Sequence, residues 1–143
     1  IQGYSTQAQQ RYDLVISNPP FFANDLKTPI QNRNFARHSN DSLTQSDLLN
    51  SAQRLMTDQG RLALIYPVQQ ANSFQQQAQV QGWFCQRKCY VKPFSDKPVK
   101  RVLLELSKKD YAPCRESTLT LETSRHTYTD QFIELIKDFY LKY

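Results

Sequence analysis

A short apolar run, Tyr12–Ser17, is cut off by the tripeptide Asn18-Pro19-Pro20. Because the run is brief and its apolar residues do not alternate regularly with polar ones, it is typical of a strand buried in a parallel sheet. Neither proline can donate to a β-ladder, so the strand has to end at the tripeptide. The polar, Gln-rich first ten residues predict a loop or a frayed end. We therefore expect a buried strand whose carboxyl end presents Asn18.

Helix and strand patterns alternate after residue 43. Thr44 followed by Asp47 resembles a capping box and predicts the start of a helix. Gly60 should close this helical unit. A second apolar run, 62–66, predicts another buried strand, and the next helix should end near Gly82. The apolar residues at helical spacing are Leu48, Leu49, Ala52, Leu55 and Met56 in the first helix and Ala71, Phe74 and Ala78 in the second. The order of these elements, which is strand, helix, strand, helix, indicates an α/β fold with a parallel sheet and crossover helices.

The last third of the chain predicts a hairpin and a terminal helix. Segments 83–91 and 99–107 are strand-like, and the stretch between them is too short for a crossover helix, so the two strands should be antiparallel. Leu119 and Leu121 alternate in a short last strand. Thr127 with Asp130 is a candidate helix cap. The apolar stripe that follows should pack in the core; it comprises Phe132, Ile133, Ile136, Phe139 and Tyr140.

Composition narrows the class of protein. With 143 residues and 39% apolar content, the chain has the material for one compact domain. No apolar run approaches the roughly 20 residues that span a bilayer, so we expect no membrane segment. Cys85, Cys89 and Cys114 form no disulfide framework or paired metal motif, so we expect no metal and a reducing, cytoplasmic setting. Cys85 and Cys89 should share one face of their strand. The net charge of +5 suits an RNA partner or an ordinary basic surface equally well.

The segment Asn18-Pro19-Pro20-Phe21 carries the chemistry. In open α/β sheets, ligands bind beyond the carboxyl ends of the strands, where this tetrad lies. An exocyclic amine on an aromatic ring is a poor nucleophile because its lone pair is delocalised. The Asn18 side-chain carbonyl and the Pro19 backbone carbonyl could accept its two hydrogens and direct the lone pair at a methyl donor. Pro20 would stiffen the loop, and Phe21 would stack on the base. The structural alternative is a Pro-Pro turn beside a buried Phe pair.

Other candidates have two interpretations each. Phe22 either walls a base pocket or packs in the core. Arg37 and His38 either contact RNA phosphates or belong to a solvated loop. Lys97 and Arg101, on the expected hairpin, either grip an RNA backbone or protect a sheet edge from unwanted pairing.

The tetrad resembles the Asn-Pro-Pro-aromatic motif of S-adenosylmethionine-dependent methyltransferases that act on adenine N6, guanine N2 or glutamine N5. The second aromatic, Phe22, and the segments 35–38, 97–105 and 139–141 together are similar to the bacterial tRNA(Val) adenine-37 N6-methyltransferases. The resemblance implies S-adenosylmethionine as cofactor, tRNA as partner, and contacts of Asn18 with both cofactor and substrate.

The resemblance also implies a seven-stranded methyltransferase sheet with an antiparallel last strand, and a Gly-rich cofactor loop after the first strand. The chain has only Gly3, Gly60 and Gly82, so we expect residues 1–143 to be one incomplete domain that lacks the N-terminal, cofactor-binding half. Three alternatives stay open: glutamine N5 methylation of a protein, guanine N2 methylation of ribosomal RNA, and a non-catalytic RNA-binding fragment. Phe21 stands where the glutamine enzymes usually have Tyr.

Overall fold

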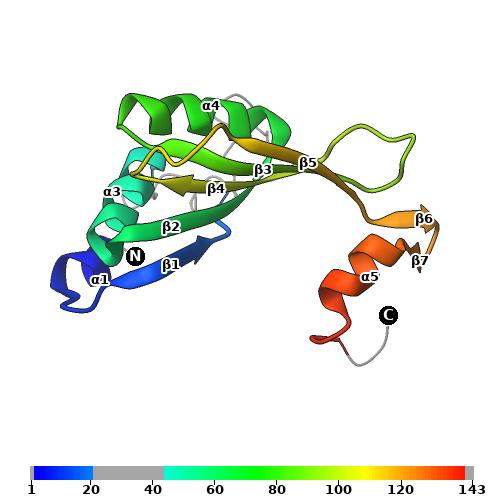
Figure 1. Ribbon diagram of the computed structural model, residues 1–143, viewed down its shortest axis with the longest axis horizontal. Helices are drawn as coiled ribbons and strands as arrows, with labels where there is room; N and C mark the ends of the chain where they lie inside the picture. The colour runs from blue at the N-terminus through cyan, green and yellow to red at the C-terminus, as the bar shows by residue number, and fades with distance from the viewer. Residues whose placement is uncertain (1, 21–43, 141–143) are drawn as a thin grey trace, which may run out of the picture.

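The computed structural model describes residues 2–20 and 44–140 (Figure 1). Their elements follow the order α1 (Gln2–Gln7), β1 (Tyr12–Ser17), α3 (Gln45–Leu55), β2 (Met56–Pro67), α4 (Val68–Val80), β3 (Phe84–Lys92), β4 (Arg101–Ser107), β5 (Arg115–Thr120), β6 (Glu122–Ser124), β7 (Thr127–Tyr128) and α5 (Asp130–Ile136). The expected α/β succession of strands and helices is confirmed.

Five strands form one sheet in the order β1-β2-β4-β3-β5. β1 runs parallel to β2, and β3 runs parallel to β5, while β4 is antiparallel to both of its neighbours. The hairpin of β3 and β4 is therefore confirmed. Its second strand lies between β2 and β3, so β1, β2, β3 and β5 all point the same way.

Helices α3 and α4 cover one face of this sheet. Thr44 caps α3 through a complete capping box, in which its hydroxyl accepts from the Asp47 backbone N–H at 3.0 Å. Gly82, with φ of 72°, takes the left-handed conformation that follows α4. The two helices and the sheet enclose a core formed by Leu48, Leu49, Ala52, Met56, Leu62, Leu64, Tyr66, Ala71, Phe74, Ala78, Trp83, Val102, Leu104 and Leu106.

The start of the chain differs from expectation in two ways. Residues 2–7 form the short helix α1 instead of a loop, because α1 packs beside α3 and buries Ser5. Strand β1 exists with the expected bounds but is not buried: Leu14 is 50% exposed and Ile16 is 73% exposed. Within the described residues β1 is an edge strand, so only β2 flanks it.

Gly60 lies inside β2 and does not close α3. The β1–β2 register jumps from Tyr12 opposite Met56 to Leu14 opposite Arg61, so the intervening residues of β2 bulge outward. A Cβ on Gly60 would lie 2.9 Å from the Met56 Cβ and 3.0 Å from the Tyr12 carbonyl oxygen. The glycine is thus required by close approach within the bulge.

A bulge in β3 also overturns the expected placement of two cysteines. Cys85 pairs with Leu106, but Arg87 pairs with Glu105, so Gln86 is an extra residue. The side-chain alternation therefore shifts between Cys85 and Cys89, which places them on opposite faces of the sheet.

The C-terminal helix was expected in the core, and this is wrong for the described residues. Helix α5 has no buried residue, and Leu135, Phe139 and Tyr140 are 58%, 85% and 62% exposed. β6, β7 and α5 extend beyond the five-stranded sheet as a separate arm (Figure 1). The N-cap is Thr129 and not Thr127, since the Thr129 side chain accepts from the Phe132 N–H.

Candidate functional site

The carboxyl ends of the parallel strands β1 and β2 lie at the same edge of the sheet. Ser17 of β1 lies opposite Leu64 of β2, and Pro67 lies opposite Arg101, the first residue of β4. The pairing of β1 with β2 ends at Ser17, and the tripeptide follows directly. Because neighbouring strands are about 4.8 Å apart, β4 lies about 10 Å from β1 across the sheet.

The tripeptide has mixed exposure at this edge. Asn18 and Pro20 are exposed, and Pro19 is buried between them. Asn18 is thus accessible, and the buried Pro19 lies directly after it. The structure thus supports the expected position of Asn18, Pro19 and Pro20 beyond the carboxyl end of a parallel strand. Phe21, Phe22, Arg37 and His38 lie outside the described residues.

Tyr66 lies near the carboxyl end of β2 and belongs to the core. It is 3% exposed, and its ring centroid lies 4.9 Å from that of Phe74 on α4. Burial raises the pKa of Tyr66 to about 12, so its phenol stays protonated at physiological pH. Sequence reasoning treated this residue only as part of an apolar run, because periodicity does not distinguish a buried tyrosine at a strand end from other core residues.

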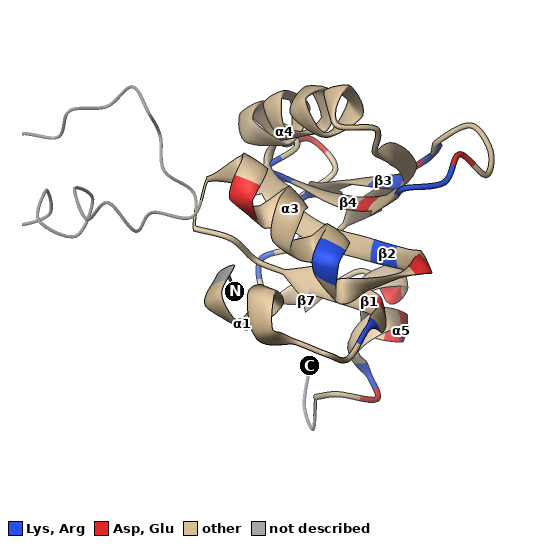
Figure 2. Cartoon of the chain, turned by 90° about the vertical axis from the view of Figure 1, so that its left-hand side faces the viewer, with Lys and Arg blue, Asp and Glu red and all other residues tan. Residues whose placement is uncertain are grey.

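The hairpin loop between β3 and β4 brings positive charge to the same edge. Arg101 and Lys97 are exposed, and in Figure 2 the loop after β3 shows basic segments beside an acidic one. Lys97 Nζ lies 3.1 Å from Asp96 Oδ2, and this contact lowers the pKa of Asp96. The structure thus brings the candidates Lys97 and Arg101 to the edge that carries Asn18.

The sheet face opposite α3 and α4 is open in the described residues. Paired residues of neighbouring strands point to the same face, so Leu14, Ile16 and Ala63 lie on this face with Leu103. Leu14, Ile16 and Leu103 are all at least 38% exposed. The exposed side of β1 is thus apolar, with Arg61 of β2 beside Leu14.

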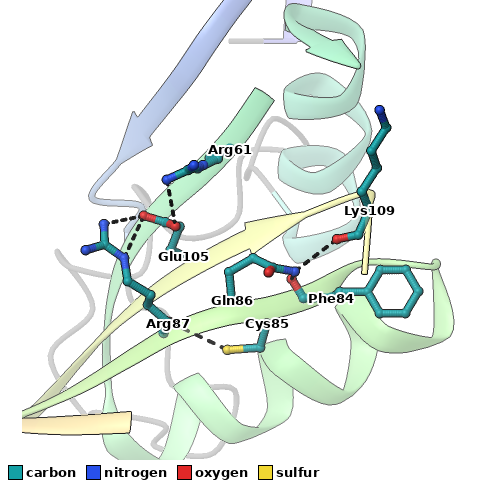
Figure 3. A network of polar contacts seen from close by, with 7 residues as sticks. All are labelled: Arg61, Phe84, Cys85, Gln86, Arg87, Glu105 and Lys109. Atoms are coloured by element: carbon teal, nitrogen blue, oxygen red, sulfur yellow. Dashed lines mark hydrogen bonds and ion pairs between the residues drawn. The ribbon is translucent and has the colours of Figure 1, made fainter. Parts of the chain in front are cut away.

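Glu105 stands on the same open face and is almost completely buried. Arg87 Nε donates to Glu105 Oε2 at 3.0 Å, and Arg61 Nη1 lies 3.4 Å from Glu105 Oε1 (Figure 3). The contact with Glu105 raises the pKa of Arg87. Sequence reasoning missed this cluster, because its three residues come from three different strands.

The glycines of the described residues do not gather in a Gly-rich loop. Gly60 lies within the β2 bulge and Gly82 follows α4, so neither forms a Gly-rich loop at the carboxyl edge of a strand. In residues 2–20 and 44–140 no three His, Cys, Asp or Glu side chains gather as a group that could hold a metal ion. No helix in this described part is long and apolar enough to cross a membrane.

Comparison with curated proteins identifies relatives of the chain. The chain is 54% identical over 143 residues to a protein of Trichodesmium erythraeum named tRNA1(Val) (adenine(37)-N6)-methyltransferase. The match covers 100% of this chain and 59% of the relative. Proteins of the same name from Parabacteroides distasonis and Proteus mirabilis are 40% and 36% identical. The resemblance expected from the sequence is confirmed. These matches cover 99% and 100% of the chain and 62% and 58% of the two relatives, so the chain spans less than two thirds of its relatives' length.

Comparison with solved structures supports the fold. A crystal structure of a predicted O-methyltransferase from Agrobacterium tumefaciens matches 92% of this chain and 53% of that chain, with a TM-score of 0.58 and 19% identity. The sheet is therefore part of a class I methyltransferase fold, as expected. No protein-family model matches the chain.

Proposed function

We propose that this chain is part of an S-adenosylmethionine-dependent methyltransferase that methylates the exocyclic N6 of an adenine in tRNA, at position 37 of tRNA(Val). The observation that carries the proposal is the exposed Asn18 directly after the carboxyl end of β1, followed by the buried Pro19. Similarity over the whole chain to proteins named for this reaction supports it.

In this proposal the chain's own residues position the amine. The Asn18 side-chain oxygen accepts one N6 hydrogen, and the Pro19 backbone carbonyl accepts the other. With both hydrogens held, the nitrogen lone pair points out of the base plane, where attack on a methyl group is possible. Pro20 restricts the loop, and Phe21, outside the described residues, stacks on the adenine. S-adenosylmethionine supplies the methyl group, and Asn18 also contacts it.

We further propose that the rest of the full-length protein covers the open sheet face and provides most of the cofactor site. Parallel sheets are normally covered on both faces, whereas here Leu14, Ile16 and Leu103 are exposed. The chain also spans only 59% of the Trichodesmium erythraeum relative. On this basis residues 1–143 are one incomplete domain that binds S-adenosylmethionine poorly alone.

Contacts with tRNA would come from the basic hairpin and from the segment before α3. Lys97 and Arg101 stand at the edge that carries Asn18, so a base held by Asn18 would bring its phosphates toward them. Arg37 and His38 are further candidates. An enzyme of this kind would act in the cytoplasm, on tRNA.

The test uses the full-length protein with labelled S-adenosylmethionine and unmodified total tRNA, followed by analysis of the labelled nucleoside. We expect N6-methyladenosine, and its loss in Asn18→Ala. The control variant Asn50→Ala changes an exposed asparagine on α3 and should keep the full rate. Label retained at full rate by Asn18→Ala would refute the role of the tetrad.

The same assay, repeated with ribosomal RNA and with cellular protein in place of tRNA, separates the alternatives. Label in ribosomal RNA as N2-methylguanosine, or in protein as N5-methylglutamine, would replace the adenine substrate by one of the other two amines. Binding of tRNA without transfer of label to any of the three substrates would favour a non-catalytic RNA-binding protein.

A further inference from the structure

Two cysteines that are 29 positions apart in the sequence meet at one end of the sheet. The Sγ atoms of Cys85 and Cys114 lie 3.0 Å apart. Cys85 stands near the start of β3, and Cys114 directly precedes β5. The parallel pairing of β3 with β5, which sets Arg87 opposite Arg115, brings the two segments side by side.

The register of β3 against β5 and the bulge in β3 together decide which cysteine takes part. The extra residue, Gln86, turns Cys85 toward the face that packs against the core, whereas Cys89 lies on the opposite face. Cys114 meets Cys85 and not Cys89, because Cys89 also lies farther along the strand pair, opposite Ser117. Without the bulge, Cys85 and Cys89 would lie on the same face, so the bulge gives the chain one close pair and one separate cysteine.

The environment of the pair keeps one thiol protonated and leaves both within reach of a small oxidant. Both side chains are half-buried. Burial, and then the hydrogen bond with Cys114, raise the pKa of Cys85 to about 12. The charge of Lys88 lowers the pKa of Cys85 and that of Glu116 raises it, but both effects are smaller than that of burial.

We propose that Cys85 and Cys114 are an oxidation-sensitive pair that a peroxide converts into an intramolecular disulfide. In the first step the Cys114 sulfur attacks hydrogen peroxide: a sulfur–oxygen bond forms, the O–O bond breaks, and one water leaves with the thiol proton. In the second step the Cys85 sulfur attacks the Cys114 sulfur of the resulting sulfenic acid as the Cys85 proton passes to the sulfenic oxygen. The S–S bond forms, the sulfur–oxygen bond breaks, and a second water carries away the Cys85 proton. Two thiols are oxidised and one peroxide is reduced to two waters.

The disulfide would fasten the edge strand β5 to β3. β5 leads directly into the arm of β6, β7 and α5, and the segment enclosed between Cys85 and Cys114 contains the basic hairpin. Closing a loop of this size restricts the unfolded chain. Oxidation would therefore stabilise the folded protein and fix the position of the strand that leads into the arm. This proposal does not depend on the function proposed above.

The experiment treats the full-length protein with hydrogen peroxide, blocks remaining thiols with N-ethylmaleimide, and maps peptides without reduction. We expect a peptide linked through Cys85 and Cys114, which dithiothreitol releases, and a rise of the melting temperature by about 5–10 °C. Cys89→Ser should leave the linked peptide unchanged, whereas Cys114→Ser should abolish it.

Circular dichroism of the reduced variants verifies that each is folded. A disulfide that contains Cys89, or oxidation of Cys114 to sulfinic acid without any linked peptide, would overturn the proposal. The same linked peptide forming equally fast in protein unfolded by urea would also overturn it, because the pairing would then owe nothing to the fold.

Discussion

Arg87 on β3 reaches across to Glu105 on β4, with the guanidinium Nε donating to the carboxylate at 3.0 Å. The Glu105 side chain is 10% exposed, whereas that of Arg87 is 59% exposed. Arg61 on β2 approaches the same carboxylate from the other side. Glu105 thus links three strands at the centre of the open face.

Replacing Glu105 by Ala should lower the free energy of unfolding by about 1–3 kcal/mol, because the two arginines lose their shared acceptor. Urea denaturation of the full-length protein measures the change. Glu134→Ala removes an exposed pair with Lys137 on α5 and should cost less than about 0.5 kcal/mol. Equal costs for the two variants would mean that the Glu105 cluster contributes no more than a surface ion pair.

Thr129→Ala should loosen the C-terminal arm. The Thr129 hydroxyl accepts from the Phe132 N–H at 3.2 Å and donates to the Thr120 carbonyl at 2.6 Å. Loss of this cap should cost about 1 kcal/mol, and hydrogen exchange of the α5 amides should accelerate. Thr127→Ala is the matched control and should change neither quantity. Faster exchange in Thr127→Ala alone would contradict the assigned cap.

Gly60→Ala and Gly3→Ala form a second matched pair. A Cβ at position 60 would meet three atoms within 3.0 Å, two of them backbone oxygens, whereas one at position 3 has no atom within 4 Å. Gly60→Ala should therefore destabilise by about 1–3 kcal/mol through overpacking. Gly3→Ala should be neutral or slightly stabilising, because alanine favours helix α1. Comparison of thermal melting curves tests this order of stability.

Tyr66 should make stability depend on pH above neutrality. Its pKa is raised from 10.0 to about 12 in the folded state, so between these values the folded protein retains a proton that the unfolded chain releases. The free energy of unfolding should therefore fall as pH rises from 10 to 12. Tyr66→Phe should show a shallower fall, and the slopes of both proteins should coincide below pH 9. Identical slopes above pH 10 would contradict the raised pKa.

Lys97→Ala and Arg101→Ala should each weaken tRNA binding and reduce its salt dependence, by about one unit of slope for each lost phosphate contact. Filter binding at several salt concentrations measures both quantities. Lys109 is exposed beyond the other end of β4, so Lys109→Ala should leave the affinity and the slope unchanged. An equal loss in Lys109→Ala would indicate a general charge effect instead of an RNA contact at the hairpin.

Local patterns in the sequence determined most elements of the fold. The apolar run Tyr12–Ser17, the capping box at Thr44 and the short connection between β3 and β4 each predicted the observed element, because each depends on hydrogen bonds and side chains close in sequence. The Asn18-Pro19-Pro20 segment was located in the same way, as the end of a strand. Its assigned roles remain predictions.

Only the tertiary structure decided which surfaces are covered and which distant residues meet. The exposure of Ile16 follows from the edge position of β1, and the exposure of α5 follows from its place beyond the sheet. The contact of Cys85 with Cys114 depends on the pairing and register of β3 with β5 and on the bulge in β3. Periodicity reports which side chains share a face, but not whether another element packs against that face, because burial and long-range contacts arise only when strands pair in a particular order and register.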